Sequence, residues 1–394
     1  MYDLIVVGGG PGGSAVASYI AKSGKKVLLI EKETFPRFRI GESLLPYSME
    51  IFEDLGFDKV LAEGKYIRKE GAMFVDVAKD TSCYFDFDDG GKAKYPFCYE
   101  VDREIFDKDF LEHAQSLGVE VRQPEEYVDS EFFDDHVVVK TTEGKYQTKF
   151  VIDATGSKAL IHRKFVDRVA NPTYSNNFSV FTQFTGVDRS FLRNEGDICI
   201  GILKNNFWSW QIPFKGESTS IGIVANQAEL AAADNLEEFF EKRLEENPWL
   251  RGTLKNATRT KDFKVVSNFS YTSDKFCGKR WASVGDAMSF LDPVFSSGVH
   301  LSLMSAKLIS ENILHSLENE TIFLDDEANI KDYNAEIKKG VSRFNNLLQL
   351  FYRGDFVEKV KNIEKKKFMT SAMTCAVSGG MWEEDNYLYR MGVL

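Results

Sequence analysis

The hydrophobic pattern at the start of the chain predicts a strand, a helix and a second strand in close succession. Tyr2–Val7 is a short apolar run with several β-branched residues, and a glycine-rich block follows it. Ser14–Ser23 has helical spacing and ends before Gly24, and Lys26–Ile30 is again apolar and strand-like. A strand, a helix and a strand in this order form a βαβ unit, the building block of a Rossmann-like α/β domain.

The pattern changes twice further along the chain. Residues 178–224 are rich in Phe, Trp, Ile and Thr at strand-like spacing without intervening helices, so they predict an antiparallel sheet. Beyond residue 324 the periodicity is helical, most clearly in Tyr333–Phe351. Further strands are expected at 71–87, 119–122, 136–141, 149–152, 264–270 and 281–285, and further helices at 102–118, 236–244 and 297–316.

We therefore expect an α/β fold with three parts. These are a discontinuous Rossmann-like nucleotide-binding domain (1–75, 100–165 and 265–325), an inserted antiparallel β-sheet substrate domain (76–99 and 166–264) and a helical C-terminal segment (326–394). A chain of 394 residues exceeds the usual size of one hydrophobic core, which agrees with more than one packed unit.

Composition and charge narrow the classes of function. Hydrophobic residues make up 43% and charged residues 28% of the chain, as in ordinary globular proteins. The net charge of −11 and the lack of a Lys/Arg block argue against nucleic acid as a partner. Because no stretch approaches the roughly 20 apolar residues that span a bilayer, we expect no transmembrane segment.

The cysteines argue against a disulfide framework and against a metal site. The chain has five of them, Cys83, Cys98, Cys199, Cys277 and Cys375, and they form no CxxC pair. No group of histidines has the spacing of metal ligands either. This usage fits a reducing, cytoplasmic location.

The glycine-rich block predicts a dinucleotide site. Gly8, Gly10 and Gly13 fit G-x-G-x-x-G between a strand and a helix, where backbone N–H groups can approach a pyrophosphate. Glu31 lies 23 residues after Gly8, at the end of the second strand, where it can accept a hydrogen bond from a ribose hydroxyl. The motif is weak alone, but here it has the βαβ context that it requires.

Three later segments favour FAD over a nicotinamide cofactor. Gly41–Ser43, Val151–Gly156 and Gly285–Ala287 resemble, in this order, the successive FAD-contacting motifs of flavin monooxygenases and their relatives. Asp286 can accept from the ribityl hydroxyls, while Arg103 can face the phosphate or the ring edge. The expected FAD-contacting residues are Gly8, Gly10, Gly13, Glu31, Ser43, Arg103, Gly156 and Asp286.

Three further features resemble the flavin-dependent halogenases. Phe207–Pro213 contains W-x-W-x-I-P, a pattern of that family. Asp292–Leu301 resembles the family's halide and flavin loop, and Lys69 stands where the family places its catalytic lysine. The resemblance runs from Gly8 to about Asp355, which is most of the chain.

The resemblance implies a reaction and assigns roles. In the family, reduced FAD from a separate reductase uses O₂ to oxidise a halide to hypohalous acid, which reaches a lysine through a short tunnel. Lys69 would be that catalytic lysine, and backbone N–H groups of Ser297 and Gly298 at a helix N-terminus would bind the halide. Trp208 and Trp210 would line the tunnel. The chain contains no second glycine-rich nucleotide unit, which agrees with a separate reductase.

One departure from the family pattern narrows the expected substrate. The tryptophan-modifying branch carries a glutamate where this chain has Phe295, so the carboxylate that assists the lysine is missing. Phe295 matches the branch that acts on phenols and pyrroles, often while these are tethered to a carrier protein. Such small aromatic rings are electron-rich and need less help in losing a ring proton. The group that accepts this proton is not assigned by the sequence.

Each feature also has a structural interpretation when it is taken alone. Tryptophans that alternate with polar residues are typical of one packed face of a strand. Lys69 lies among charged residues like those of a solvated face, and Ser296–Gly298 is compatible with a plain helix cap. It is their joint occurrence, in the family's order, that favours the halogenase interpretation.

Three other functions stay open at this point. An FAD-dependent reductase of the geranylgeranyl reductase type shares the FAD frame and a related aromatic segment at 208–213, but the second tryptophan and the Ser296–Gly298 loop argue against it. An aromatic monooxygenase would use the same oxygen chemistry directly on its substrate and needs no W-x-W-x-I-P segment. A flavoprotein that binds or senses without catalysis is the last alternative.

Overall fold

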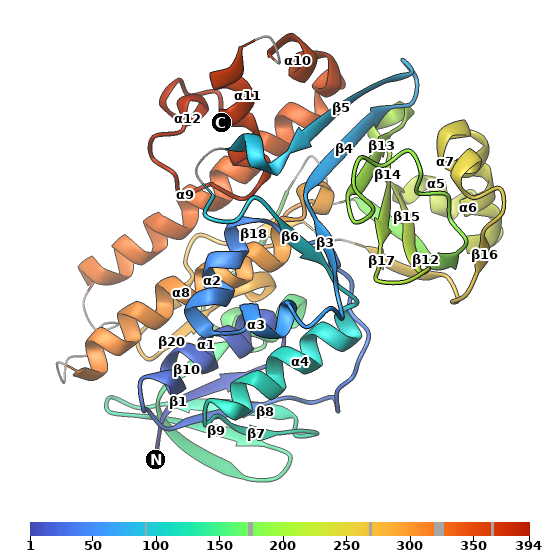
Figure 1. Ribbon diagram of the computed structural model, residues 1–394. Coiled ribbons are helices and arrows are strands. Elements are labelled where there is room, and N and C mark those ends of the chain that lie inside the picture. The colour runs from blue at the N-terminus through green and yellow to red at the C-terminus, as the bar shows by residue number, and fades with distance from the viewer. Residues whose placement is uncertain (91–92, 172–175, 268–269, 319–326, 364–365) are drawn as a thin grey trace.

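A large, mainly parallel sheet forms the base of the molecule in Figure 1. The computed structural model describes residues 1–394 except 91–92, 172–175, 268–269, 319–326 and 364–365. The strand order is β19 (Cys277–Gly278), β20 (Trp281–Ser283), β10 (Lys145–Asp153), β1 (Tyr2–Val7), β2 (Val27–Ile30) and β7 (Glu120–Arg122). The strands from β20 to β7 run parallel, and β8 (Tyr127–Phe132) and β9 (Val137–Thr141) extend β10 as antiparallel additions.

Helices cover this sheet as the predicted βαβ unit requires. The crossover helix α1 (Pro11–Lys22) connects β1 to β2 and packs against α4 (Arg103–Ser116) and α8 (Ser297–Glu318). All four residues of β2 are buried, as expected for a parallel strand that is covered on both faces. The predicted Rossmann-like α/β architecture is therefore confirmed.

The second sheet is the part predicted from the Phe-rich middle of the chain. Its order is β16 (Thr258–Arg259), β12 (Asn177–Thr185), β15 (Thr219–Asn226), β14 (Trp208–Pro213), β13 (Ile198–Ile202), β4 (Gly71–Asp76) and β5 (Thr81–Asp86), with β17 (Lys264–Ser267) also paired to β12. Neighbouring strands are antiparallel except β4 and β13, which run parallel. A hydrophobic cluster on one face packs against α6 (Leu236–Glu245) and α7 (Pro248–Thr253).

Strand β4 matters for the predicted domain limits. This strand pairs in the second sheet, and the predicted limit between the nucleotide-binding domain (to residue 75) and the substrate domain (from residue 76) falls inside it. The limits at 325 and 326, and residues 268–269 of the strand expected at 264–270, lie outside the described residues. The division into three domains stays a prediction.

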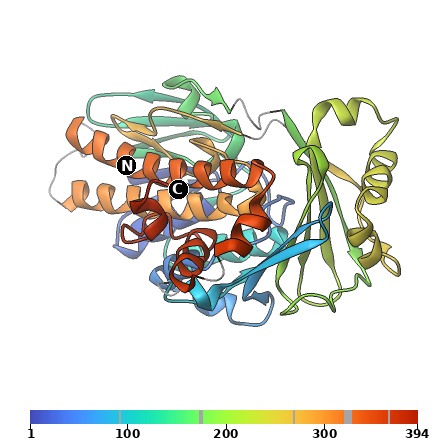
Figure 2. The same cartoon turned by 90° about the horizontal axis from the view of Figure 1, so that it is seen from above.

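The C-terminal helices pack on α8 and on strands β4 and β5 of the second sheet. Helix α9 (Glu327–Tyr352) lies beside α8, and α10 (Phe356–Ile363) packs on β4 and β5 (Figures 1 and 2). Helix α11 (Lys367–Val377) packs on the short helix Phe87–Gly90, and α12 (Tyr387–Arg390) follows it. Among the helices that the structure describes, none combines the length and the apolar character needed to cross a membrane.

Two very short strands were not expected from the pattern. Strands β3 (Ile67–Lys69) and β6 (Cys98–Glu100) form a separate two-stranded sheet between the two large ones. Three residues are too few to display a period of two, so hydrophobic alternation cannot reveal such strands. Both of them carry residues of the candidate site.

Candidate active site

Three turns come together at the carboxyl ends of β1, β10 and β20. Gly8–Gly10 follows β1, Gly156 follows β10, and Gly285–Ala287 follows β20. The turn at Gly156 packs against Gly285–Ala287. Ligands of open α/β sheets bind at such strand ends. The structure thus brings together the glycine motif and two of the three segments predicted to contact FAD.

Close packing explains two of the glycines after β1. A Cβ on Gly8, whose φ is +106°, would lie 2.3 Å from the Ala154 carbonyl oxygen, and one on Gly13 would lie 1.9 Å from the Gly8 carbonyl oxygen. Neither backbone atom can move aside, so only glycine fits. A Cβ on Gly10, in contrast, would meet only Arg37 Nη2, at 3.6 Å. The missing side chain there leaves room for a ligand at the N-terminus of α1.

Glu31 closes the same turn from the end of β2. Its buried Oε2 accepts from the Gly9 N–H at 2.7 Å, and its Oε1 accepts from the Glu33 N–H at 2.9 Å. Each carboxylate oxygen has a second lone pair that can accept from a ribose hydroxyl. The ribose contact stays a prediction, but it is compatible with the structural task that the carboxylate performs.

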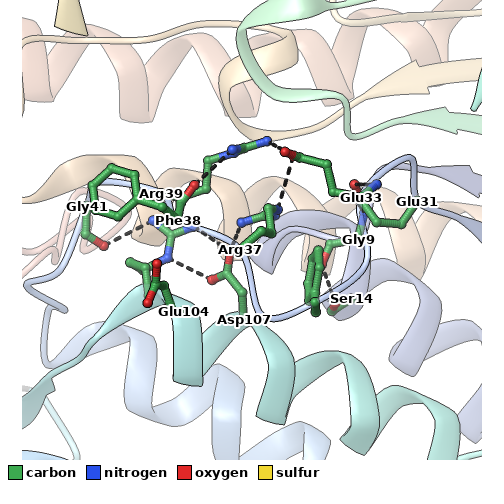
Figure 3. A network of polar contacts seen from close by, with 12 residues as sticks. Gly9, Ser14, Glu31, Glu33, Arg37, Phe38, Arg39, Gly41, Glu104 and Asp107 are labelled. Carbon is green, nitrogen blue, oxygen red and sulfur yellow. Dashed lines mark hydrogen bonds and ion pairs between the residues drawn. The ribbon is translucent and has the colours of Figure 1, made fainter. Parts of the chain in front are cut away.

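A network of arginines and carboxylates lies beside the turn (Figure 3). Arg103 Nε and Arg37 Nη1 each donate to the buried Asp107 carboxylate, both at 2.7 Å. Within the described part of the chain, Arg37 Nε is buried without a hydrogen-bond partner. Arg39 pairs with Glu33 closer to the surface. Arg37 Nε also lies 3.7 Å from Glu33 Oε2, so three guanidinium groups share the carboxylates of Asp107 and Glu33, and the positive charge that remains suits a pyrophosphate.

The sequence prediction included Arg103 but missed Arg37 and Asp107. Arg103 and Asp107 are four residues apart on α4, a spacing that places two side chains on one helix face. That spacing was an available signal for Asp107. Arg37 lies in a loop, where no periodicity indicates the direction of a side chain.

Asp286 is held in place through its main chain. Its carbonyl accepts from Tyr271 Oη at 2.7 Å and from Arg168 Nη2 at 3.1 Å. Burial raises the pKa of Asp286 to about 6, and the charges of Arg103 and Arg168 oppose this shift. A Cβ on nearby Gly156, whose φ is +60°, would have no neighbour within 4 Å. A carboxylate on a backbone held in this way can accept from a hydroxyl of a bound ligand.

Lys69 does not lie on a solvated face. Its side chain is 1% exposed, and Nζ donates to Ser43 Oγ at 2.8 Å and to the Leu44 carbonyl oxygen at 3.0 Å. The alternative prediction, that Lys69 belongs to a solvated face, is therefore wrong. Ser43, predicted to contact FAD, turns its hydroxyl towards Lys69, and its FAD contact stays a prediction.

The two tryptophans of W-x-W-x-I-P occupy one face of β14. Their ring centroids are 5.9 Å apart, and both rings are buried in the core cluster that also contains Phe295. Trp210 Nε1 donates to Ser220 Oγ on β15, and Trp208 Nε1 donates to Tyr352 Oη on α9, each at 3.1 Å. The packed-face interpretation is thus correct for their geometry, and it is compatible with a role as a wall.

The loop before α8 is anchored by a fully buried carboxylate. Asp292 Oδ2 accepts from Tyr352 Oη at 2.8 Å, and its Oδ1 accepts from the Val294 N–H at 3.3 Å. Burial raises the pKa of Asp292 to about 6. Since Tyr352 also accepts from Trp208, a hydrogen-bonded chain links β14, α9 and this loop. Asp292 lies in the segment that resembles the halide and flavin loop, and Tyr352 lies in the C-terminal part expected to cover the substrate side, but the contact between them was not predicted.

Ser297 and Gly298 form the first turn of α8, as predicted. Ser296 has a φ of +56° and precedes a helix of 22 residues. The N–H groups of a first helical turn have no acceptor within the helix, and the helix dipole favours an anion there. A Cβ on Gly298 would meet only Phe290, at 3.7 Å. The turn is therefore compatible with a halide, and halide binding stays a prediction.

Phe295 lies in a cluster of aromatic rings. Its centroid is 5.7 Å from that of Phe74 on β4, 5.8 Å from Phe351 on α9 and 5.7 Å from Phe356 on α10. A glutamate at this position would carry its charge into the three surrounding rings. The surroundings of position 295 are thus built for an apolar side chain.

A pocket lies where the loop before Gly41 meets the second sheet. Phe38, Glu42, Phe181 and Lys264 are among its lining residues. The Phe38 and Phe181 rings stack with centroids 5.9 Å apart. Burial raises the pKa of Glu42 to about 8, and no hydrogen-bond partner of its Oε2 is found among the described residues. The cavity volume is about 30 Å³, which is too small for an aromatic ring in this conformation.

Comparison with known proteins agrees with this geometry over nearly the whole chain. The family model described as tryptophan halogenase matches residues 3–94 and 88–391. The 1H-pyrrole-2-carbonyl-[peptidyl-carrier protein] chlorinase of Pseudomonas fluorescens is 32% identical over 379 residues, which cover 89% of this chain and 84% of that protein.

Solved structures of flavoproteins share the fold. The myxobacterial chondrochloren halogenase CndH, an FAD-dependent halogenase, is 32% identical with a TM-score of 0.82, covering 89% of this chain and 82% of that one. A flavoprotein/dehydrogenase from Cytophaga hutchinsonii is 26% identical with a TM-score of 0.89, covering 100% of this chain and 96% of that one.

Proposed function

The chain belongs to the tryptophan halogenase family, and we propose that it halogenates an electron-rich aromatic ring, a pyrrole or a phenol, that is tethered to a carrier protein. The predicted family, the FAD-dependent oxidoreductase class and the FAD cofactor are confirmed by the comparisons. The reductase and monooxygenase alternatives are not favoured by them. The substrate and the role of each residue are the proposal.

The residues at the strand ends fit FAD. Gly10 and Gly156 leave space that no side chain fills, Arg37 Nε lacks a hydrogen-bond partner among the described residues, and the Asp286 carboxylate can accept from a hydroxyl. These residues, with Glu31, would hold the dinucleotide. When bound and reduced, FAD supplies the oxidising power of O₂ that turns a halide into an electrophilic halogen.

The buried ammonium group of Lys69 is the observation that carries the proposal. Two of its three N–H donors are fixed by Ser43 Oγ and the Leu44 carbonyl, which leaves a third donor for an incoming oxygen. A lysine held in this way can orient hypohalous acid towards a substrate ring. Trp208 and Trp210 would separate that ring from the flavin, and the first turn of α8 would hold the halide.

The substrate class follows from the surroundings of Phe295. Its ring neighbours exclude a charged partner for the lysine at this position, so a substrate that is already electron-rich is favoured. The 32% identity to a chlorinase of carrier-bound pyrrole supports the same class. We also propose that a separate reductase supplies the reduced flavin and that the enzyme works in the cytoplasm.

Product mass after turnover tests the proposal. Purified protein is given FAD, a flavin reductase, NADH, air and bromide, with pyrrole-2-carbonyl or phenol groups offered free and on a carrier protein. Brominated product is expected, with the carrier-bound pyrrole favoured. Hydroxylated product that is independent of bromide, or no product with any ring, would refute the halogenase assignment.

The lysine is tested in the same assay. Lys69→Ala should lower bromination about a hundredfold or more, the range seen when a positioned proton-transfer group is lost. Lys65→Ala is the matched control, because Lys65 is a partly exposed lysine of the same segment that pairs with Asp109. Equal rates for both variants would remove the role of Lys69 while leaving the family assignment intact.

A further inference from the structure

Three short stretches of chain place a lysine, a serine and a glutamate on one face. In the antiparallel pair β3–β6, Ile67 lies opposite Glu100, so Lys69 and Glu100 are diagonal neighbours on the same side. Ser43 forms an isolated bridge opposite Glu100 on the other edge of β6. The pairing of these three backbone segments therefore places the three side chains next to one another.

The three side chains form a continuous hydrogen-bonded chain. Lys69 Nζ donates to Ser43 Oγ at 2.8 Å, and Ser43 Oγ donates to Glu100 Oε1 at 3.0 Å. The direct distance from Lys69 Nζ to Glu100 Oε1 is 4.0 Å, and both side chains are almost fully buried. The serine hydroxyl thus stands between the ammonium group and the carboxylate as a bridge.

Glu100 also has an unused oxygen. Its Oε2 is buried and has no hydrogen-bond partner within the described residues. A buried carboxylate is costly without compensation, and Lys69 is the cation that compensates it here. Packing alone does not require a carboxylate at this place, since a neutral side chain of the same shape would avoid the cost.

We propose that Glu100, acting through Ser43, is the carboxylate partner of Lys69 and replaces the one that this chain lacks at position 295. The inference rests on the proposed role of Lys69. Glu100 and Ser43 are positioning residues. They hold the lysine nitrogen in place and take up its proton, since Ser43 can receive a proton from Lys69 while passing its own to Glu100. The products are a neutral amine, an unchanged hydroxyl and a neutral carboxyl group, with no change in total charge.

The surroundings of Glu100 suit a proton exchange near neutral pH. Burial raises its pKa to about 8, against the opposing effects of Lys69 and Ser43, while Asp197 and Glu42 raise it further. Burial also raises the pKa of Cys98, whose thiol donates to the Leu44 carbonyl oxygen rather than to Glu100. These groups are the charged and titratable neighbours of the pair.

The test compares Glu100→Gln with Glu70→Gln. Glu70 is adjacent to Lys69 in sequence, but its side chain is 40% exposed and pairs with Arg68, so the same chemical change occurs outside the buried cluster. The probe is the pantetheine thioester of pyrrole-2-carboxylate with bromide, because its ring does not titrate between about pH 6 and 9. A soluble β-diketone that traps free hypobromous acid is measured in parallel.

Glu100→Gln is expected to lower ring bromination about a hundredfold while trapped hypobromous acid is unchanged. In the parent protein, bromination should rise with pH through about 8 as Glu100 becomes a carboxylate, and the Gln variant should lose this rise. Glu100→Asp, which keeps a carboxylate, should retain part of the bromination rate and part of its rise with pH. Ser43→Ala, which removes the bridge without removing a charge, should show the same loss and gives a second test if Glu100→Gln folds poorly.

Two results would overturn the inference. One is a parent-like rate and pH profile in both Glu100→Gln and Ser43→Ala while Lys69→Ala is inactive. The other is a parallel loss of trapped hypobromous acid and of product, which would place the defect at halide oxidation. An active Lys69→Ala variant would instead remove the proposed function of the lysine, and the inference with it.

Discussion

Asp292→Asn is expected to make the stability of the protein less sensitive to pH. The Asp292 carboxyl is completely buried, and burial raises its pKa from 3.8 to about 6, although Tyr352 and Val294 donate hydrogen bonds to it. In the unfolded chain the same group has an ordinary pKa. Between about pH 4 and 6 the folded protein therefore holds a proton that the unfolded chain has lost, so the free energy of unfolding falls as pH rises.

The size of the effect follows from the shift. About two pKa units at roughly 1.4 kcal/mol each lower the free energy of unfolding by about 3 kcal/mol. This loss is absent below about pH 4 and complete above about pH 6. Asparagine keeps the shape and carries no charge; its amide oxygen can accept from the Val294 N–H, and its amide N–H can donate to Tyr352 Oη. At roughly 2 °C per kcal/mol, the melting temperature of the variant relative to the parent should rise by about 5 °C between about pH 4 and 7.

The assay is thermal unfolding of both proteins at several pH values, followed by circular dichroism. Comparing the two proteins at each pH cancels the other buried carboxyl groups. Asp274→Asn is the control, because that side chain is 95% exposed and should give no such trend. A difference in melting temperature that stays constant from pH 4 to about 7 would refute the reasoning that burial of Asp292 costs stability.

Two further predictions concern FAD. Gly13→Ala should abolish FAD binding and lower the melting temperature, because the new Cβ would lie 1.9 Å from the Gly8 carbonyl oxygen. Gly252→Ala is the control: its Cβ would have no neighbour within 4 Å, so FAD binding and the melting temperature should stay unchanged. FAD titration of both variants decides this. Arg37→Gln should weaken FAD binding about tenfold or more, the value of one charge-assisted hydrogen bond, and Arg39→Gln, at a side chain that is 43% exposed, should change it little. Equal dissociation constants for these two variants would contradict the assignment of Arg37 to the pyrophosphate.

The dinucleotide site was predictable because its signals are local. The strand, the glycine turn and the helix are contiguous, and the clash at Gly13 shows why this spacing must be kept. Helix α1 begins at Pro11, three residues before the predicted start at Ser14, because the glycines that break an apolar pattern are themselves part of the first helical turn. The contact between Arg37 and Asp107 was not predicted because it joins residues 70 positions apart, whereas the spacing of four residues between Arg103 and Asp107 was an available signal.

The tryptophans show that the structural and functional interpretations need not compete. Trp208 and Trp210 are packed on one face of β14, as alternation predicts. That face is turned to the cluster containing Phe295, so packing and a wall function use the same surface. What alternation could not show is the hydrogen bond to Tyr352, which lies 144 positions away in the chain.

The segment at residues 41–44 explains why a residue predicted to contact FAD lies beside the lysine. The Gly41 carbonyl oxygen accepts from Arg103 Nη1 at 3.1 Å, and two residues later Ser43 Oγ accepts from Lys69 at 2.8 Å. Two residues of extended chain span about 7 Å, so both contacts act on one short stretch of backbone. Arg103 and Lys69 are thus linked through this one backbone segment. A sequence motif links Ser43 to the FAD site alone, whereas the extended segment that carries it contacts both Arg103 and Lys69.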